Sequence, residues 1–128
     1  MIFQNHRVSE ARLAKIKNQQ PLLLVAYHKD KPIGFKLGYT IAGTARFFSW
    51  LGGVHPDFRR QGLAQRMLEI QEAYASKIGS SEIYFTSFEK FPAMIRLGKR
   101  NGYRLTRSEM DEGELKFWYA KTLNPTPN

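Results

Sequence analysis

Apolar residues in the first half of the chain fall in short runs separated by polar or glycine-containing turns. The run from Leu22 to Tyr27 predicts a buried strand, and the run from Ile33 to Tyr39 predicts its hairpin partner. A third run, from Phe47 to Val54, is long and aromatic and predicts another strand. Ahead of these strands, Ser9 is suited to cap a short helix that reaches about Asn18.

The spacing of apolar residues changes to a helical period after Gln61. From there to about Lys77 they recur every three or four positions, which predicts a long amphipathic helix lying on a sheet. The expected apolar stripe consists of Leu63, Ala64, Met67, Leu68, Ile70, Gln71, Tyr74, Ala75 and Ile78.

The last third of the chain predicts a strand, a short helix and a hairpin. The expected ranges are Glu82 to Ser87, Ala93 to Arg100 with Pro92 in its first turn, Tyr103 to Arg107 and Leu115 to Lys121. Hairpins thus flank one strand–helix–strand unit, which predicts an α+β (mixed α/β) fold. We expect a mixed, mostly antiparallel sheet with helices on both faces, in one domain over residues 1–123 followed by a loose tail at 124–128.

Composition and charge narrow the class of protein. The chain has 128 residues, enough for one two-layer domain, and no cysteine, so we expect neither a disulfide framework nor a thiolate metal site, and we expect no metal cofactor. The sequence has no apolar run of membrane-helix length and no secretion signal, which favours a cytoplasmic protein without a membrane partner. The net charge of +9 attracts polyanions, whether nucleic acid, an acidic membrane surface or a phosphorylated small molecule.

The stretch GGVHPDFRRQGLAQRML, residues 52–68, has the chemistry of an anion site. The first amides of a helix have no acceptor inside the helix, and the helix dipole favours a negative charge beside them. Gly62 lets the backbone approach a ligand closely, because it has no Cβ. The stretch has neither the GxGxxG of a dinucleotide fold nor the lysine and serine of a P-loop.

The pattern Arg59-x-x-Gly62-x-Ala64, preceded by Val54-x-Pro56, resembles the acetyl-coenzyme A motif of the GNAT superfamily of N-acetyltransferases. Here it stands between a strand and a long helix, and a second helix later ends in Asn-Gly-Tyr, as in the second acyl-CoA segment of that family. The resemblance covers roughly residues 22–123. It implies a GNAT-type fold with a shortened N-terminal part, because only about twenty residues precede the first confident strand.

The resemblance also implies where acetyl-CoA binds. Backbone amides at the start of the long helix would hold the pyrophosphate, two arginines would flank it, and the pantetheine arm would pair with strand edges that have moved apart. The implied cofactor-binding residues are Val54, Arg59, Arg60, Gln61, Gly62, Leu63, Ala64, Gln65 and Ser87. Gly52 and Gly53 suit a bulge or a close ligand approach, although strand-end flexibility explains them too. Lys99 and Arg100 either reach the 3′-phosphate or only stabilise a helix dipole.

The implied reaction is direct transfer of an acetyl group from acetyl-CoA to a primary amine in a ternary complex. A backbone N–H at Val54 or His55 could polarise the thioester. The strand over residues 45–54 carries none of the acids that relatives place there, so Glu89 and His55 are the nearest candidate bases, with a water chain as the alternative.

The usual helix tyrosine, a proton donor to the leaving thiolate in many relatives, is replaced by Gly98. Gly98 either opens room for a bulkier acyl group or packs closely against a neighbour. In place of that tyrosine, water, Tyr84 or Tyr103 would supply the proton, or none is needed.

Three questions stay open at the level of sequence. The short N-terminal part leaves the acceptor site either open or completed by a partner subunit, so a homodimer is one alternative. A non-catalytic acyl-CoA binder would keep the amide cradle without proton transfer. A nucleic-acid module would explain the charge and the strand aromatics, but the chain lacks an RNP-type run, so we do not expect a nucleic-acid partner.

Overall fold

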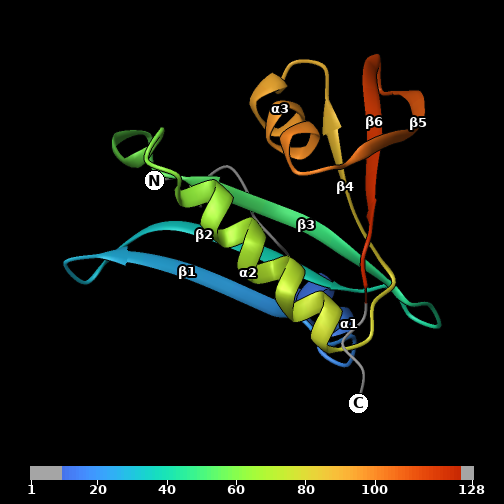
Figure 1. The fold of residues 1–128 in the computed structure, drawn as a ribbon, viewed down its shortest axis with the longest axis horizontal. Coiled ribbons are helices and arrows are strands. Elements are labelled where there is room, and N and C mark those ends of the chain that lie inside the picture. Colours follow the sequence, from blue (N-terminus) through green and yellow to red (C-terminus); the bar gives the residue numbers. More distant parts are fainter. Residues whose placement is uncertain (1–9, 125–128) are drawn as a thin grey trace.

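The computed structural model describes residues 10–124, which form six strands and three α-helices (Figure 1). In chain order these are α1 (Glu10–Ile16), β1 (Leu22–His28), β2 (Lys31–Thr40), β3 (Arg46–Val54), α2 (Leu63–Lys77), β4 (Glu82–Phe88), α3 (Pro92–Arg100), β5 (Arg104–Asp111) and β6 (Glu114–Thr122). The predicted cap at Ser9 and most of the tail lie outside the described residues. Within the described range, no helix is long and apolar enough to cross a membrane.

The strands form one mixed sheet in the order β1-β2-β3-β4-β6-β5. All neighbouring pairs are antiparallel except β3 and β4, which are parallel because α2 connects them. In Figure 1, α2 crosses in front of β1, β2 and β3, α3 lies beside β4, and α1 is seen behind the sheet near the end of α2. The predicted strand–helix–strand unit with flanking hairpins is therefore confirmed.

The single parallel pairing is short. β3 and β4 are in register at three positions, Arg46 with Glu82, Phe47 with Ile83 and Phe48 with Tyr84. Beyond these pairs the two strands move apart, and Figure 1 shows β3 and β4 diverging into a V. The expected divergence of these strands is present, and it divides the sheet into a β1–β3 half and a β4–β6 half.

The core lies between α2, α3 and the middle of the sheet. Its most buried apolar side chains are those of Phe47, Leu68, Ala75, Ile83 and Phe85. The buried positions of α2 are Met67, Leu68, Gln71 and Ala75. Ile70, expected inside the apolar stripe, is 48% exposed, because the buried side of α2 is centred on Leu68 and Gln71.

The first strand differs from its prediction. β1 is an edge strand rather than a buried one, and Leu23 and Tyr27 are 60% and 65% exposed. Among the described strands only β2 is a neighbour of β1, so an edge position leaves much of its apolar surface in contact with solvent. Continuous apolar character is shared by central and edge strands, which is why the sequence did not separate the two.

Gly38 on β2 marks the closest approach of α2 to the sheet. A Cβ at this position would lie 2.5 Å from a ring carbon of Phe47, 2.7 Å from Nε2 of Gln71 and 2.8 Å from the carbonyl oxygen of Phe48. Two of these neighbours are fully buried and the third is backbone, so none can move away easily.

We therefore expect Gly38→Ala to lower the free energy of unfolding by about 1–3 kcal/mol, the usual cost of overpacking. Gly34→Ala is the matched comparison on the same strand and face, where the nearest atoms lie at 3.2–3.3 Å and include the flexible ends of Leu63 and Met67. Denaturant unfolding should show the smaller loss for Gly34→Ala. Equal losses would contradict the close approach at Gly38.

Candidate active site

The free edge of β3 lines the opening between the two halves of the sheet. The N–H of His55 donates to the carbonyl of Ile33 at 2.7 Å, which makes these two a hydrogen-bonded pair. Backbone groups alternate in direction along an antiparallel ladder, so the N–H and C=O of Val54 and Gly52 point the other way, into the opening. Gly52 is exposed there.

The β-bulge between β2 and β3 lies next to Gly52 and Gly53 rather than at them. The register between β2 and β3 shifts between Leu37 and Gly38, which leaves Trp50 of β3 as the extra residue. Of the alternatives for Gly52 and Gly53, the bulge is therefore wrong, and the close ligand approach stays a prediction. On the facing strand Ser87 is buried, and its register partner on β6 is Phe117.

The turn after β3 fixes one arginine at the mouth of the opening. His55 caps a short 3₁₀ turn, Pro56–Phe58, by accepting the Asp57 N–H on Nδ1 at 3.1 Å. The chain then folds back, so that Nε of Arg59 donates to the Val54 carbonyl at 3.0 Å. Arg60 is exposed and has a left-handed backbone with φ of 62°.

The first turn of α2 presents unbonded amides next to these arginines. Gly62 is the N-cap, with φ of 79° and no side-chain cap, and a Cβ built on it meets no atom within 4 Å. The first intrahelical bond runs from Arg66 N–H to the Gly62 carbonyl at 3.0 Å. The amides of residues 63–65 therefore have no acceptor within the helix, and the first turn holds no acid that would repel an anion. This geometry fits a bound phosphate.

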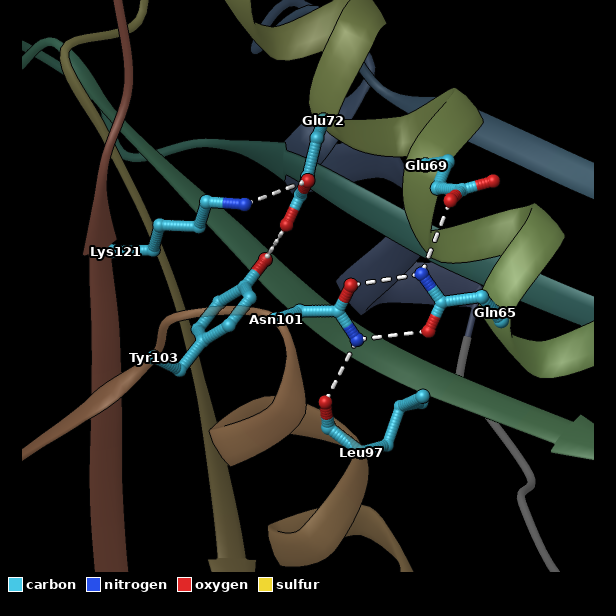
Figure 2. Close-up of polar contacts among 7 residues, drawn as sticks. All are labelled: Gln65, Glu69, Glu72, Leu97, Asn101, Tyr103 and Lys121. Carbon is cyan, nitrogen blue, oxygen red and sulfur yellow. Dashed lines mark hydrogen bonds and ion pairs between the residues drawn. The ribbon is translucent and has the colours of Figure 1, made fainter.

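An amide pair joins the start of α2 to the end of α3. Gln65 Nε2 donates to Oδ1 of Asn101 at 2.7 Å, and Asn101 Nδ2 donates back to Oε1 at 2.8 Å (Figure 2). Asn101 also donates to the Leu97 carbonyl at 2.8 Å, which ties the pair to α3. Lys99 and Arg100 lie in the last turn of α3, the helix end that this pair joins to the first turn of α2. Sequence reasoning assigned Asn101 only to helix termination and missed this contact.

A second polar cluster lies deeper between the helices. Glu72 of α2 accepts from the Tyr103 hydroxyl at 2.7 Å and from Nζ of Lys121 at 3.1 Å (Figure 2). Burial first, and the Glu72 carboxylate second, raise the pKa of Tyr103 far above its usual range. Burial is also the main cause that raises the pKa of Tyr84. Tyr103 already donates its proton to Glu72, so it is a poor candidate for the proton donor to a thiolate.

Gly98 is required for close packing. A Cβ at this position would lie 2.5 Å from Cζ of Phe85, whose side chain is fully buried in the core. The space that a helix tyrosine would need is thus filled by an aromatic ring. Of the two interpretations, packing against a neighbour is the one that the structure supports, and room for a bulkier acyl group is wrong.

The two candidate bases stand on opposite sides of the opening. His55 follows β3 and Glu89 follows β4, and since these strands diverge, their ends are held apart. Glu89 is exposed, and its N–H donates to the Leu115 carbonyl at 3.2 Å. The His55 N–H is already bonded to Ile33, so Val54 is left as the backbone donor that faces the opening.

Together, a diverging parallel strand pair and an amide cradle at the following helix define a class of protein that binds phosphorylated acyl donors. A family model described as Acetyltransferase (GNAT) domain matches residues 19–105. The chain therefore belongs to the GNAT family of acetyltransferases, which transfer acetyl groups from acetyl-CoA. A search of curated proteins finds no match.

Solved structures share this fold at low sequence identity. The ribosomal-protein-S18-alanine N-acetyltransferase of Escherichia coli is 18% identical with a TM-score of 0.79, over 94% of this chain and 80% of that one. Arabidopsis thaliana NAA60, in complex with a bisubstrate analogue, is 17% identical with a TM-score of 0.79, over 98% and 90%. The PaiA N-acetyltransferase of Thermoplasma acidophilum, in complex with coenzyme A, is 17% identical with a TM-score of 0.75, over 94% and 76%.

The amide pair between α2 and α3 generates a prediction. Asn101→Ala should lower the free energy of unfolding by about 1–2 kcal/mol, because the half-buried Gln65 amide loses two hydrogen bonds and keeps only the one to Glu69. A double-mutant cycle with Gln65→Ala, followed by denaturant unfolding, measures the coupling between the two side chains. Additive losses would contradict the pair.

Proposed function

We propose that this chain moves the acetyl group of acetyl-CoA to a primary amine by direct attack in a ternary complex. The observation that carries the proposal is the row of unbonded amides at the start of α2, which stands at the mouth of an opening lined by strand backbone. An anion-binding helix start and an adjacent free strand edge suit a ligand that has a pyrophosphate at one end and an amide-containing arm at the other.

The binding roles follow from this arrangement. The amides of residues 61–65 would hold the pyrophosphate, with Arg59 and Arg60 beside it. The arm would lie in the opening along the free edge of β3 and bond to backbone groups there, such as those of Gly52 and the N–H of Val54, since the Val54 carbonyl already accepts from Arg59. Lys99 and Arg100 would contact the 3′-phosphate, and the bond between Gln65 and Asn101, which joins their helix end to the start of α2, supports this role.

The chemical step needs a polarised carbonyl and a proton acceptor. The Val54 N–H faces the opening and would stabilise negative charge on the carbonyl oxygen as the amine attacks. Glu89 or His55 would accept the proton of the attacking amine, directly or through water. The carbon–sulfur bond then breaks, and CoA leaves with the sulfur.

Gly62 provides a test of the cradle with a matched control. Gly62→Ala should cost about 1–2 kcal/mol of stability, because alanine is strained at a positive φ. Relief of that strain would shift the first turn of α2 with its amides and weaken binding of acetyl-CoA at least about tenfold. Gly79→Ala lies just past the other end of the same helix, with φ of 93° and open space around its Cβ position. Calorimetry should show loss of binding for Gly62→Ala only, and equal affinity for both variants would refute the cradle.

A pH–rate comparison separates the two candidate bases. If Glu89 accepts the proton, Glu89→Gln should lower kcat/KM by about 10²–10⁴-fold and abolish the acidic limb of the profile. His55→Gln should then keep that limb. The reverse result would assign the base to His55, and two unchanged profiles would exclude both. Release of free thiol from acetyl-CoA, in the presence of a panel of amines, is the measurement.

A further inference from the structure

Lys36 is a buried cation in the interface between β2 and α2. Cβ atoms at Gly34 and Gly38 would point at side chains of α2, and since strand residues alternate, Lys36 between them shares that face. Its side chain is only 6% exposed. No hydrogen bond or ion pair joins its ammonium group to any residue within 10–124.

The lysine side chain lies across β3 at Gly52. Measured from the position that a Cβ on Gly52 would occupy, Cγ of Lys36 is at 3.7 Å and Nζ at 3.8 Å. Gly52 is the register partner of Lys36, is exposed, and turns its backbone groups into the opening. The missing side chain at Gly52 therefore lets the ammonium group reach the wall of the opening.

The groups around Lys36 leave its charge only partly compensated. From α2 the carboxylate of Glu72 faces it, but that carboxylate already accepts from Tyr103 and Lys121 (Figure 2). Its register partners are apolar or lack a side chain, Leu24 on β1 and Gly52 on β3. Burial lowers the pKa of Lys36 to about 8, and the attraction of Glu72 opposes this only in part.

The two ends of the opening limit which part of a bound acyl-CoA can lie at Gly52. The cradle at residues 61–65 anchors the phosphate end beyond Val54, and the arm must run back along β3. The strand pairing at Phe48 and Tyr84 closes the opening at the other end. In the proposed complex the thioester, at the tip of the arm, would therefore lie along β3 between this closure and Val54, the stretch that contains Gly52.

We propose that Lys36 is the proton donor to the sulfur that leaves during acetyl transfer, an assignment that rests on the proposed function. When the amine has added to the carbonyl carbon, the carbon–sulfur bond breaks and its electron pair goes to sulfur. A proton moves from Nζ to that sulfur, so that CoA leaves as the thiol and Lys36 becomes a neutral amine. The proton released by the attacking amine, passed through solvent, restores the ammonium.

The acidity of Lys36 suits this step. A general acid works best when its pKa lies near the operating pH. A thiol has a pKa of about 8.5, so a thiolate can take a proton from an acid whose pKa is about 8. An ordinary lysine, with a pKa of 10.5, would hold its proton more tightly. A retained buried and unpaired ammonium destabilises a fold, so its presence calls for a functional reason.

The test uses CoA as the probe and needs no knowledge of the acceptor. Ultraviolet absorbance of the thiolate is followed while the pH of the CoA complex is raised, for the wild type and for Lys36→Met, which keeps the buried methylenes. The nearby ammonium should make the bound thiol ionise at least about one pH unit lower in the wild type than in Lys36→Met. Lys31→Met, an exposed lysine on the same strand, is the control and should titrate like the wild type.

Thermal unfolding provides a second readout. Below about pH 8 Lys36 is charged in both states, but only in the folded state is that charge buried, which lowers the free energy of unfolding. Between about pH 8 and 10.5 the folded protein loses this proton while the unfolded chain keeps it, so the free energy of unfolding rises with pH. Lys36→Met should therefore have a Tm at least equal to that of the wild type at pH 7, with the difference shrinking at higher pH. A lower Tm at pH 7 would mean that the lysine serves the fold and would overturn the assignment.

The titration also separates this inference from the function on which it rests. Lys36→Gln, which also removes the charge, repeats the thiol titration as a second variant. Binding of CoA with the same thiol titration in both proteins would overturn the role of Lys36 and leave the proposed function standing. Failure of the wild type to bind CoA would overturn the proposed function and this role with it.

Discussion

The three-position pairing between β3 and β4 is the constraint on which the rest of the structure depends. Once the strands separate after Phe48 and Tyr84, the facing backbone edges have no strand partner over the remainder of their length. Buried backbone donors and acceptors must find other partners, so an opening of this kind either stays wet or accepts a ligand that supplies amide groups. The adjacent start of α2 adds a site for negative charge at the mouth of that opening.

Polar contacts on the helix side hold the two halves of the sheet together where the backbone does not. Gln65 and Asn101 connect the start of α2 with the end of α3, and Glu72 connects the middle of α2 with Tyr103 and Lys121. These contacts are directional and would weaken sharply with a shift of either helix. They therefore support the width of the opening, whereas the strand pairing at Phe48 and Tyr84 closes its narrow end.

Main-chain groups account for most of the proposed site. The cradle depends on backbone amides and on a glycine with positive φ, and the opening depends on the strand edge. Such a site leaves the side chains around it free to vary in chemistry, which fits the absence of an acid along β3 and the glycine in place of a helix tyrosine. Lys36 reaches the same opening from a neighbouring strand, across the space that Gly52 leaves.

Local sequence patterns determined the elements and the cradle, because strand alternation, helical period and the start of α2 at Gly62 all depend on residues a few positions apart. Whether β1 is central or at an edge, and which side of α2 is buried, depended on segments that meet only in the folded chain. The same holds for the ring of Phe85 at Gly98, the partner of Asn101 and the burial of Lys36. Only tertiary packing decides these features, since burial is set by what the distant parts of the chain place against each side chain.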